Sequence, residues 1–343
     1  MCTLCPRYCR FPTEKTVGGC GVRIRLDGKI QLGIYGKTTG WALDPIEKKP
    51  MFHFYPGSCA FSIGTIGCNL FCRFCQNWVI SQSRISAKSL KLPLRLDDLP
   101  PETAVKYAKE NGCTSIAYTY NEPIVWYEYM YDTAKLAHKE GIKNVMVSNG
   151  YINEDPLKEL APYIDGANID LKGDETFYRK LTGTLKAPET ILNTIKILKE
   201  KGTMVEITIL IIPKWNDSED FFKWIGKWVL DNFGPEGLPV HLSRFYPNYK
   251  LRSLPPTPVR TIEKARGILM ELGLKYVYVG NVPGHPGEHT YCPNCGKPVI
   301  KRDGFIITEY NLTDDNKCKF CGYKISIRGN YRMERSWVYF HIF

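Results

Sequence analysis

The sequence lacks the long apolar segment that a membrane-spanning helix needs, because it has no run of about eighteen apolar residues. Its first residues, MCTLCPRYC, do not combine a charged region with an apolar one, so we expect no signal peptide and a cytoplasmic location. It also has no internal repeat of fixed period and no low-complexity stretch. We therefore expect no transmembrane helix and no repeat architecture, and the composition of the 343 residues is that of an ordinary soluble globular protein.

The sequence also lacks a dense run of lysine and arginine and any nucleic-acid-binding motif, although its formal net charge is +11. We therefore interpret the charge as a basic surface and nothing more. Lys317, Lys319, Phe320 and Tyr323 bring basic and aromatic residues together only weakly. An RNA-binding or RNA-modifying protein that uses zinc ribbons stays an alternative, and nucleic acid is not the favoured partner.

Strand-like and helix-like segments alternate from about residue 61 onward. The strand-like segments are rich in β-branched and aromatic residues and are bounded by glycine, proline or asparagine. They cover 61–67, 114–120, 143–149, 166–172, 205–212 and 239–246, with a further one at 275–282. Helical patterns lie between them at 101–112, 124–141, 189–202 and 218–233. This alternation predicts an α/β protein with a parallel sheet in a full or partial (β/α)6-type barrel.

Two cysteine-containing regions flank the predicted barrel. Residues 1–60 contain a group of four cysteines near the N-terminus and the dipeptide Asp27-Gly28 between two strand-like segments, which predicts a cysteine-rich cap with a hairpin. The barrel then covers residues 61–286. Residues 287–343 hold another four cysteines in loop-like sequence, which indicates a zinc-ribbon-like metal-binding module and a tail.

The chain has thirteen cysteines, and their clustering favours metal ligation over disulfides. The C-terminal group consists of Cys292, Cys295, Cys318 and Cys321. Its C-x2-C-x22-C-x2-C spacing is typical of structural zinc, with an auxiliary iron–sulfur cluster as the alternative. The N-terminal group consists of Cys2, Cys5, Cys9 and Cys20. For this less regular group zinc and an auxiliary cluster are nearly equal, with a second structural metal slightly preferred. We expect the leftover Cys59 and Cys113 to be free and buried.

A third group, Cys68, Cys72 and Cys75, lies in the segment GCNLFCRFCQNW after the first barrel strand. Its C-x3-C-x2-C spacing supplies three thiolates, whereas zinc sites and ordinary four-iron clusters usually take four protein ligands. Three thiolates can hold three irons of a four-iron cluster and leave the fourth iron open to another ligand. A zinc site with a ligand from elsewhere, or plain core cysteines, would also fit this spacing.

The array, with Phe74 directly before its last cysteine, resembles the signature of radical S-adenosylmethionine (SAM) enzymes. Further segments are similar to the AmmeMemoRadiSam system radical SAM enzymes, a branch related to the pyruvate formate-lyase activating enzyme. These segments are DPIEKKPMFHFYPGS (44–58), SIGTIGCNLFCRFCQNWVISQ (62–82), YTYNEP (118–123), VSNGY (147–151), NIDLKG (168–173), HLSRFYPNY (241–249), YVYVGN (276–281) and TYCPNCG (290–296). The resemblance implies a [4Fe–4S] cluster whose open iron binds SAM. It also implies an oxidoreductase that cleaves SAM reductively and abstracts hydrogen from a substrate through a 5′-deoxyadenosyl radical.

The resemblance implies that Phe74 and residues at the ends of the second and third strands bind the cofactor. Asn121 and Glu122 in YNEP take the place of the motif that holds the methionyl amine of SAM. Ser148 and Asn149 are expected to line the adenosine pocket. A carboxylate near an ammonium group is the expected partner, although an acid at a helix start is also common.

The resemblance also points to residues on later strands. Asp170 and Lys172 match an alternate-residue pair of the activating enzymes, and we expect them to act at the reaction centre. The chain departs from the activating enzymes in carrying Val147 in place of an acid and Thr208 where an arginine would meet SAM. Arg244 on the sixth strand is the candidate for the missing positive charge.

The expected partners are SAM, an electron donor such as ferredoxin or flavodoxin, and the Memo-like and AMMECR-like proteins that the name of the branch implies. A glycyl-radical-enzyme activase is the alternative within the same chemistry. No membrane partner is expected. Glu47, His53 and His241 either approach the site or pack in the connector and the core.

Overall fold

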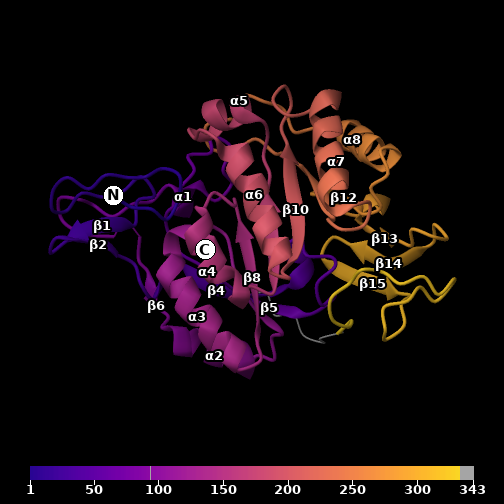
Figure 1. The fold of residues 1–343 in the computed structure, drawn as a ribbon, viewed down its shortest axis with the longest axis horizontal. Helices are drawn as coiled ribbons and strands as arrows, with labels where there is room; N and C mark the ends of the chain where they lie inside the picture. Colours follow the sequence, from indigo (N-terminus) through magenta and orange to yellow (C-terminus); the bar gives the residue numbers. More distant parts are fainter. Residues whose placement is uncertain (93, 333–343) are drawn as a thin grey trace.

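The computed structural model describes residues 1–92 and 94–332, and one large sheet forms its centre (Figure 1). The strand order is β12-β11-β10-β9-β8-β7-β5-β4. Its strands are β4 (Gly40–Pro45), β5 (Cys59–Gly64), β7 (Ser115–Tyr118), β8 (Lys143–Ser148), β9 (Gly166–Asp170), β10 (Met204–Ile211), β11 (Val240–Arg244) and β12 (Val277–Gly280). Neighbouring strands from β5 to β12 are parallel, and β4 pairs antiparallel with β5. Within the described ranges β4 and β12 do not pair with each other, so the sheet is the partial form of the predicted barrel.

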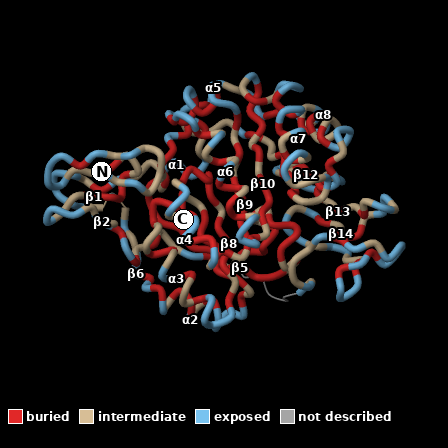
Figure 2. The backbone as a smooth tube through the Cα atoms, viewed as in Figure 1, coloured by how far each residue is buried: buried red, intermediate tan, exposed pale blue. Residues whose placement is uncertain are grey.

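Helices connect the parallel strands and pack against the sheet. The helices are α1 (Trp78–Ser81), α2 (Pro101–Glu110), α3 (Tyr127–Lys139), α4 (Glu154–Leu160), α5 (Glu175–Phe177), α6 (Ala187–Glu200), α7 (Glu219–Phe233) and α8 (Val259–Glu271). Contacts join α2 to β5 and β7, α3 to β8, α6 to β9 and β10, and α8 to β11 and β12. As expected for parallel strands covered by helices, β5 and β7 are buried along their whole length, and Figure 2 shows buried residues along the central strands. None of the helices described is long and apolar enough to cross a bilayer.

The two cysteine-rich regions lie at opposite ends of the long axis (Figure 1). In the N-terminal region β1 (Arg23–Leu26) and β2 (Lys29–Leu32) form the predicted hairpin. Asp27 and Gly28 have φ values of 51° and 75°, as the two central residues of a type I′ turn require. A short pair, β3 (Lys37–Thr38) with β6 (Asp97–Asp98), follows.

The C-terminal region forms a three-stranded antiparallel sheet of β13 (Thr290–Tyr291), β14 (Pro298–Asp303) and β15 (Ile306–Tyr310). Residues 333–343 of the predicted C-terminal module and tail lie outside the described residues. Strand β4 lies inside the range predicted for the cap, so that range also supplies one strand of the central sheet. The boundaries at residues 60 and 286 stay predictions.

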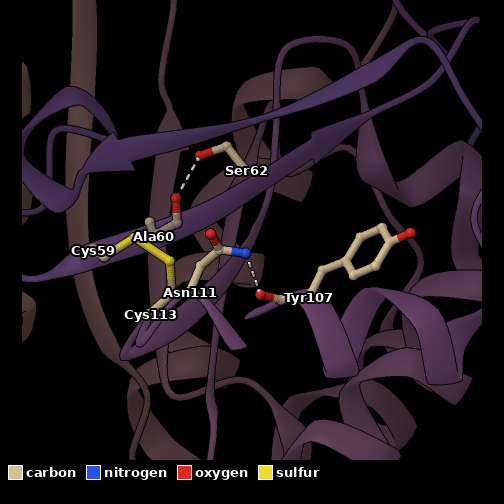
Figure 3. Close-up of a disulfide and its surroundings, with 6 residues drawn as sticks. All are labelled: Cys59, Ala60, Ser62, Tyr107, Asn111 and Cys113. Carbon is tan, nitrogen blue, oxygen red and sulfur yellow. Dashed lines mark hydrogen bonds between the residues drawn. A yellow bond between two sulfur atoms is a disulfide. The ribbon is translucent and has the colours of Figure 1, made fainter. Parts of the chain in front are cut away.

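The expectation that Cys59 and Cys113 are free is wrong, because the two form a disulfide (Figure 3). Cys59 begins β5 and Cys113 lies two residues before β7, the parallel neighbour of β5. The amino ends of adjacent parallel strands lie side by side, and the two Cα atoms are 4.5 Å apart despite a sequence separation of 54. The clustering of the other cysteines gave no indication of this pairing.

A buried polar network joins the connector after β4, the amino ends of β10 and β11, and the C-terminal module. Glu206 accepts a hydrogen bond from the backbone N–H of His53 (2.7 Å) and pairs with the His241 ring (2.7 Å). The His53 ring contacts the Tyr278 hydroxyl (2.6 Å) and the Ser326 carbonyl (2.7 Å). These contacts lie at the amino ends of the strands, whereas barrels of this kind carry their chemistry at the carboxyl ends. His53 and His241 therefore take the packing role.

Glu47 is buried in the same connector, with 1% of its surface exposed. Its Oε1 accepts a hydrogen bond from the Gly57 N–H at 3.0 Å, and its Oε2 has no hydrogen-bond partner among the residues described. Burial raises the pKa of Glu47 to about 7, although the Arg302 guanidinium and the Gly57 N–H oppose the shift. The folded protein therefore holds the neutral carboxyl more tightly than the unfolded chain does.

This raised pKa predicts a pH-dependent stability. The stability that the neutral Glu47 carboxyl contributes is fully present below the ordinary pKa of 4.5. It is lost as the pH rises toward 7, because the unfolded chain releases this proton first. Glu47→Gln should remove this loss, which amounts to about 3 kcal/mol of unfolding free energy over that window. Urea titrations across the window measure it, with the exposed Glu110→Gln as the control. Equal pH slopes for the native chain and Glu47→Gln would contradict the prediction.

Candidate active site

The three-cysteine array lies in the segment 65–77, here called the cysteine loop, which runs from the carboxyl side of β5 to α1. The backbone N–H groups of Phe71 and Arg73 donate to the carbonyls of Thr182 and Leu181, both at 2.9 Å. These acceptors belong to a π-helical turn, Tyr178–Thr182, which follows β9 and α5. Such turns are rare and occur frequently at functional sites. The cysteine loop is thus fixed against an irregular element across the sheet.

Polar groups surround the sulfur atoms of the cysteine loop. The Cys68 Sγ accepts hydrogen bonds from the Leu70 N–H (3.3 Å) and the Asn149 side-chain amide (3.7 Å). The Cys75 Sγ lies 3.2 Å from the Ser81 hydroxyl oxygen. Hydrogen bonds to sulfur stabilise thiolate charge and tune the potential of an iron–sulfur cluster. The three thiols of the array are free, so each can act as a ligand.

The three sulfurs of the cysteine loop are not packed as closely as those of the C-terminal cysteines. Across residues 1–92 and 94–332, only the C-terminal cysteines form a group of three or more potential ligands whose atoms all lie within 4.8 Å of one another. The sulfurs of the cysteine loop are therefore not gathered around one ion. In a four-iron cluster each thiolate binds a different iron, so the sulfurs must stand farther apart.

A buried carboxylate lies next to the cysteine loop. Glu122 follows β7 and is 2% exposed. Its Oε1 accepts hydrogen bonds from the Ser148 hydroxyl (2.7 Å) and the Ile124 N–H (3.0 Å), and its Oε2 accepts one from the Asn149 N–H (2.8 Å). Burial raises the pKa of Glu122 to about 7, and these three hydrogen bonds oppose the shift. A carboxylate has about four lone-pair positions, so one remains for a cationic ligand.

Asn149 connects this carboxylate to the cysteine loop. Its backbone N–H bonds Glu122, and its side-chain amide donates both to the Cys68 sulfur and to the Asn69 Oδ1 (2.9 Å). The carboxyl ends of β7 and β8 therefore meet the loop that follows β5. Four of the predicted site residues, Glu122, Ser148, Asn149 and Cys68, lie together there.

Asn121, which was also predicted, contacts the backbone of the cysteine loop. Its Oδ1 accepts a hydrogen bond from the Thr65 N–H at 3.1 Å. Its side-chain amide donates to the carbonyls of Ile66 (3.2 Å) and Gly67 (2.9 Å). These contacts fix the start of the loop immediately before its first cysteine.

The predicted pair Asp170 and Lys172 forms an ion pair beside the same loop. The Lys172 Nζ lies 2.7 Å from the Asp170 Oδ2, directly after the end of β9. The lysine side chain is 12% exposed. Burial favours the neutral amine, but the Asp170 carboxylate and the nearby Cys72 raise the pKa of Lys172 well above its ordinary value. The positive charge of Lys172 therefore interacts with one of the three sulfurs.

The remaining two predicted cofactor-binding residues have other partners in the described part of the chain. Phe74 is buried and packs edge-on against Phe177, with ring centroids 5.6 Å apart. Arg244 ends β11, and its guanidinium donates to the Thr257 carbonyl (2.8 Å) and the Tyr246 hydroxyl (3.1 Å). Where the chain is described, Arg244 makes no recorded contact with Glu122.

The C-terminal cysteines gather around one point. All four sulfurs lie within 4.8 Å of one another, with 3.6 Å between Cys292 and Cys321 and 3.8 Å between Cys295 and Cys318. Four sulfurs bound at about 2.3 Å to a tetrahedral zinc ion would stand about 3.8 Å apart. The predicted four-cysteine site is therefore present, and its spacing fits one tetrahedral ion.

The N-terminal cysteines are arranged differently. Cys2, Cys5, Cys9 and Cys20 line one cavity. None of them forms a disulfide. The first residues are held in place, because the Cys2 N–H donates to the Cys9 carbonyl (2.9 Å) and the Asn153 N–H donates to the Leu4 carbonyl (3.0 Å). The metal predicted for this group stays a prediction.

Two residues that the motifs did not single out contact this site. Asn69 is fully buried, and besides its bond from Asn149 it donates to the Tyr151 carbonyl (2.8 Å). The Tyr178 hydroxyl accepts a hydrogen bond from the Lys172 N–H (2.9 Å). The position of Asn69 inside the cysteine array is a signal that could have identified it. Tyr178 carries no such signal, because only the π-helical turn directs it toward the site.

Several known proteins are similar to this chain. The profile of the Radical SAM superfamily matches residues 62–225, which include the cysteine loop, Glu122 and the Asp170–Lys172 pair. Uncharacterized protein MJ0808 of Methanocaldococcus jannaschii is 46% identical over 327 residues, which cover 95% of each chain. The pyruvate formate-lyase 1-activating enzyme of Escherichia coli K12 is 25% identical over 224 residues, 62% of this chain and 89% of that enzyme. A solved radical SAM methyltransferase from Sphaerobacter thermophilus is 18% identical with a TM-score of 0.49, covering 66% of this chain and 67% of that one.

Proposed function

The chain belongs to the radical SAM superfamily, and on that basis we propose that it binds a [4Fe–4S] cluster through Cys68, Cys72 and Cys75 and cleaves SAM reductively. The observation that carries the proposal is the bridge that Asn149 forms between the Cys68 sulfur and the buried Glu122 carboxylate. When bound and reduced, such a cluster supplies the electron that breaks the C5′–S bond of SAM, and the resulting 5′-deoxyadenosyl radical takes a hydrogen atom from a substrate carbon.

The residues around the cysteine loop bind and orient the cosubstrate in this proposal. Glu122 binds the methionyl ammonium group of SAM through its remaining lone pair, because a charge-assisted hydrogen bond is the strongest contact that this group can make. The Ser148 hydroxyl and the Asn149 N–H hold the carboxylate in one orientation. Asn121 acts as a positioning residue, because it fixes the backbone that leads into the first cysteine.

The charged pair beside Cys72 has an electrostatic role in the proposal. The Lys172 ammonium interacts electrostatically with this sulfur and is paired with Asp170 at 2.7 Å. A fixed positive charge near a cluster favours the more negative, reduced state. The pair therefore helps the site to accept an electron. Phe74 packs against Phe177 and so anchors the segment that carries the last cysteine of the array.

Three finer assignments are part of the same proposal. We assign zinc to the C-terminal cysteines, supported by sulfur separations of 3.6 and 3.8 Å. We assign a ferredoxin or flavodoxin as electron donor, since the cleavage of SAM consumes one electron. We place the chain in the AmmeMemoRadiSam branch on the motifs quoted above, with Memo-like and AMMECR-like proteins as partners.

A glycyl-radical activase is the second candidate function. It is supported by the similarity to the pyruvate formate-lyase 1-activating enzyme, which extends over 89% of that enzyme. An activase would take its hydrogen atom from a glycine of a partner protein instead of from a small molecule. Under either function SAM is cleaved at the same cysteine loop, so one assay tests both.

Anaerobic reconstitution with iron and sulfide, followed by SAM and dithionite, tests the proposed function. The native chain is expected to form 5′-deoxyadenosine, and the triple variant Cys68→Ala/Cys72→Ala/Cys75→Ala is expected to form none, because it lacks all three iron ligands. The double variant Cys59→Ser/Cys113→Ser is the matched control. It removes two cysteines at the amino ends of the strands and should stay active. A native chain that carries its full iron content but forms no nucleoside would overturn the proposal.

A further inference from the structure

We infer that Cys2, Cys5, Cys9 and Cys20 bind a second iron–sulfur cluster, and that this cap site is the electron entry for the cysteine loop. The binding of iron in the cap stands on the arrangement of the cap alone. The role as electron entry rests on the proposed function, since it needs an acceptor at Cys68. The first observation is that the four cysteines line one cavity instead of converging on a single point.

The contrast between the two four-cysteine groups separates iron from zinc. The C-terminal sulfurs approach one another to within 4.8 Å, as a single ion requires. The cap sulfurs do not form such a group in the described ranges, although all four face the same cavity. A cube of four irons and four sulfides needs this arrangement, because its thiolates bind different corners. The Gly19 N–H donates to the Cys9 sulfur at 3.3 Å, a bond that stabilises thiolate charge.

A buried cation lines the same cavity. The Arg23 residue is 7% exposed, and two of its guanidinium nitrogens bind the Glu128 carboxylate at 2.8 and 2.6 Å. Its third nitrogen, Nε, is buried and has no hydrogen-bond partner in the described part of the chain. Cys2, Cys20 and Arg23 line the same cavity. A cluster with four thiolates is anionic, so it would supply the negative partner that this unpaired N–H group lacks.

The cap cavity is in direct contact with the cysteine loop. The Cys68 N–H donates to the Cys20 carbonyl at 3.3 Å, so a ligand of one site is hydrogen-bonded to a ligand of the other. Asn69 lines the cavity beside the Cys5 thiol, and its Oδ1 accepts from the Asn149 amide that also bonds the Cys68 sulfur. Two short covalent and hydrogen-bonded paths therefore lead from the cap site to Cys68.

These paths give the cap site its function as an electron relay. One electron leaves a reduced ferredoxin or flavodoxin, which is thereby oxidised by one electron. It enters the cap site and passes to the site at Cys68, Cys72 and Cys75, where it is consumed in the cleavage of SAM. No bond forms or breaks and no proton moves in the transfer between the two sites.

The metal content of a variant without the SAM site tests the first half of the inference. Cys68→Ala/Cys72→Ala/Cys75→Ala leaves the cap sequence intact. After anaerobic reconstitution with iron, sulfide and zinc, we expect about four irons per chain, half of the native content, and a paramagnetic resonance signal after reduction. Adding Cys5→Ser and Cys9→Ser should remove this iron, whereas adding Cys295→Ser should lower zinc and leave iron unchanged. A triple variant without iron, or with a second zinc in its place, overturns the inference.

The electron route is tested in the chain with an intact SAM site. Cys5→Ser/Cys9→Ser should lose the 5′-deoxyadenosine formation that reduced flavodoxin or ferredoxin drives, while dithionite, a small reductant, still supports it. Circular dichroism and iron analysis serve as the control for folding: a folded variant keeps the native spectrum and the iron at the cysteine loop. Unchanged formation with the protein donor overturns the electron route. A native chain that fails with dithionite refutes the proposed function instead, so the two failures are distinguishable.

Discussion

Glu122→Gln is expected to raise the dissociation constant for SAM by about 10- to 100-fold, the effect of losing about 1.4 to 3 kcal/mol from a hydrogen bond to a charged group. The neutral amide cannot pair with an ammonium ion. In addition, each oxygen of Glu122 accepts from a backbone N–H, Ile124 on one side and Asn149 on the other. An amide NH2 group therefore meets a donor in either orientation. Anaerobic calorimetric titration of SAM into the reconstituted chain measures the change.

Glu110→Gln provides the matched control for this prediction. It makes the same substitution at the end of α2, where the Glu110 side chain is 56% exposed and lies 3.7 Å from Lys106. Exposed pairs of this kind contribute little, so the control should bind SAM like the native chain. Native-like affinity in a Glu122→Gln chain that retains its iron would refute the assignment of Glu122 to the methionyl ammonium.

Gly67→Ala is expected to destabilise the chain by about 2 to 5 kcal/mol and to lower its iron content. Gly67 precedes the first cysteine of the array with a φ of +90°, a conformation that alanine rarely adopts. An added Cβ would lie 2.6 Å from the Cys20 carbonyl oxygen and 2.7 Å from the Val22 side chain. The chain can relieve this clash only by moving the cap away from the loop. This movement breaks the hydrogen bond from the Cys68 N–H to the Cys20 carbonyl. Urea unfolding and iron analysis measure the two effects.

Gly112→Ala separates the clash from the backbone strain. Gly112 also has a positive φ, +66°, but a Cβ there would meet nothing within 4 Å. The control should therefore cost only the strain, about 1 to 2 kcal/mol, and should bind iron normally. Equal losses of stability for the two alanine variants would show that the cap does not press on the cysteine loop at Gly67.

The sequence predicted local features well where a few neighbouring residues decide them. The Asp27-Gly28 turn forms as expected, because both residues adopt positive φ values readily. The helical pattern at 218–233 forms α7, and Ser218 caps this helix by accepting a hydrogen bond from the Phe221 N–H at 3.3 Å. The alternating segments became parallel strands with helices between them, since their apolar residues can be buried only in that arrangement. The further segment at 275–282 contains β12.

Contacts between distant segments could not be read in the same way. Cys59 and Cys113 are 54 residues apart, and only the pairing of β5 with β7 brings them together. No sequence motif pointed to Glu206, yet its carboxylate joins the His53 backbone to the His241 ring at the amino ends of the strands. Strand β4 was assigned to the cap, because a sequence segment does not reveal which sheet edge it will cover.

By itself the sequence determined the three cysteine groups, the order of strands and helices, and the residues at the carboxyl ends of the strands, because spacing and periodicity are local properties. Only the tertiary structure decided how the groups are arranged. In the tertiary structure the C-terminal sulfurs lie around one point, whereas the cap sulfurs lie around a cavity. The Cys68 N–H also donates a hydrogen bond to the Cys20 carbonyl. The physical reason is that sulfur separations and contacts between loops depend on the packing of segments far apart in the chain, which cysteine spacing does not encode.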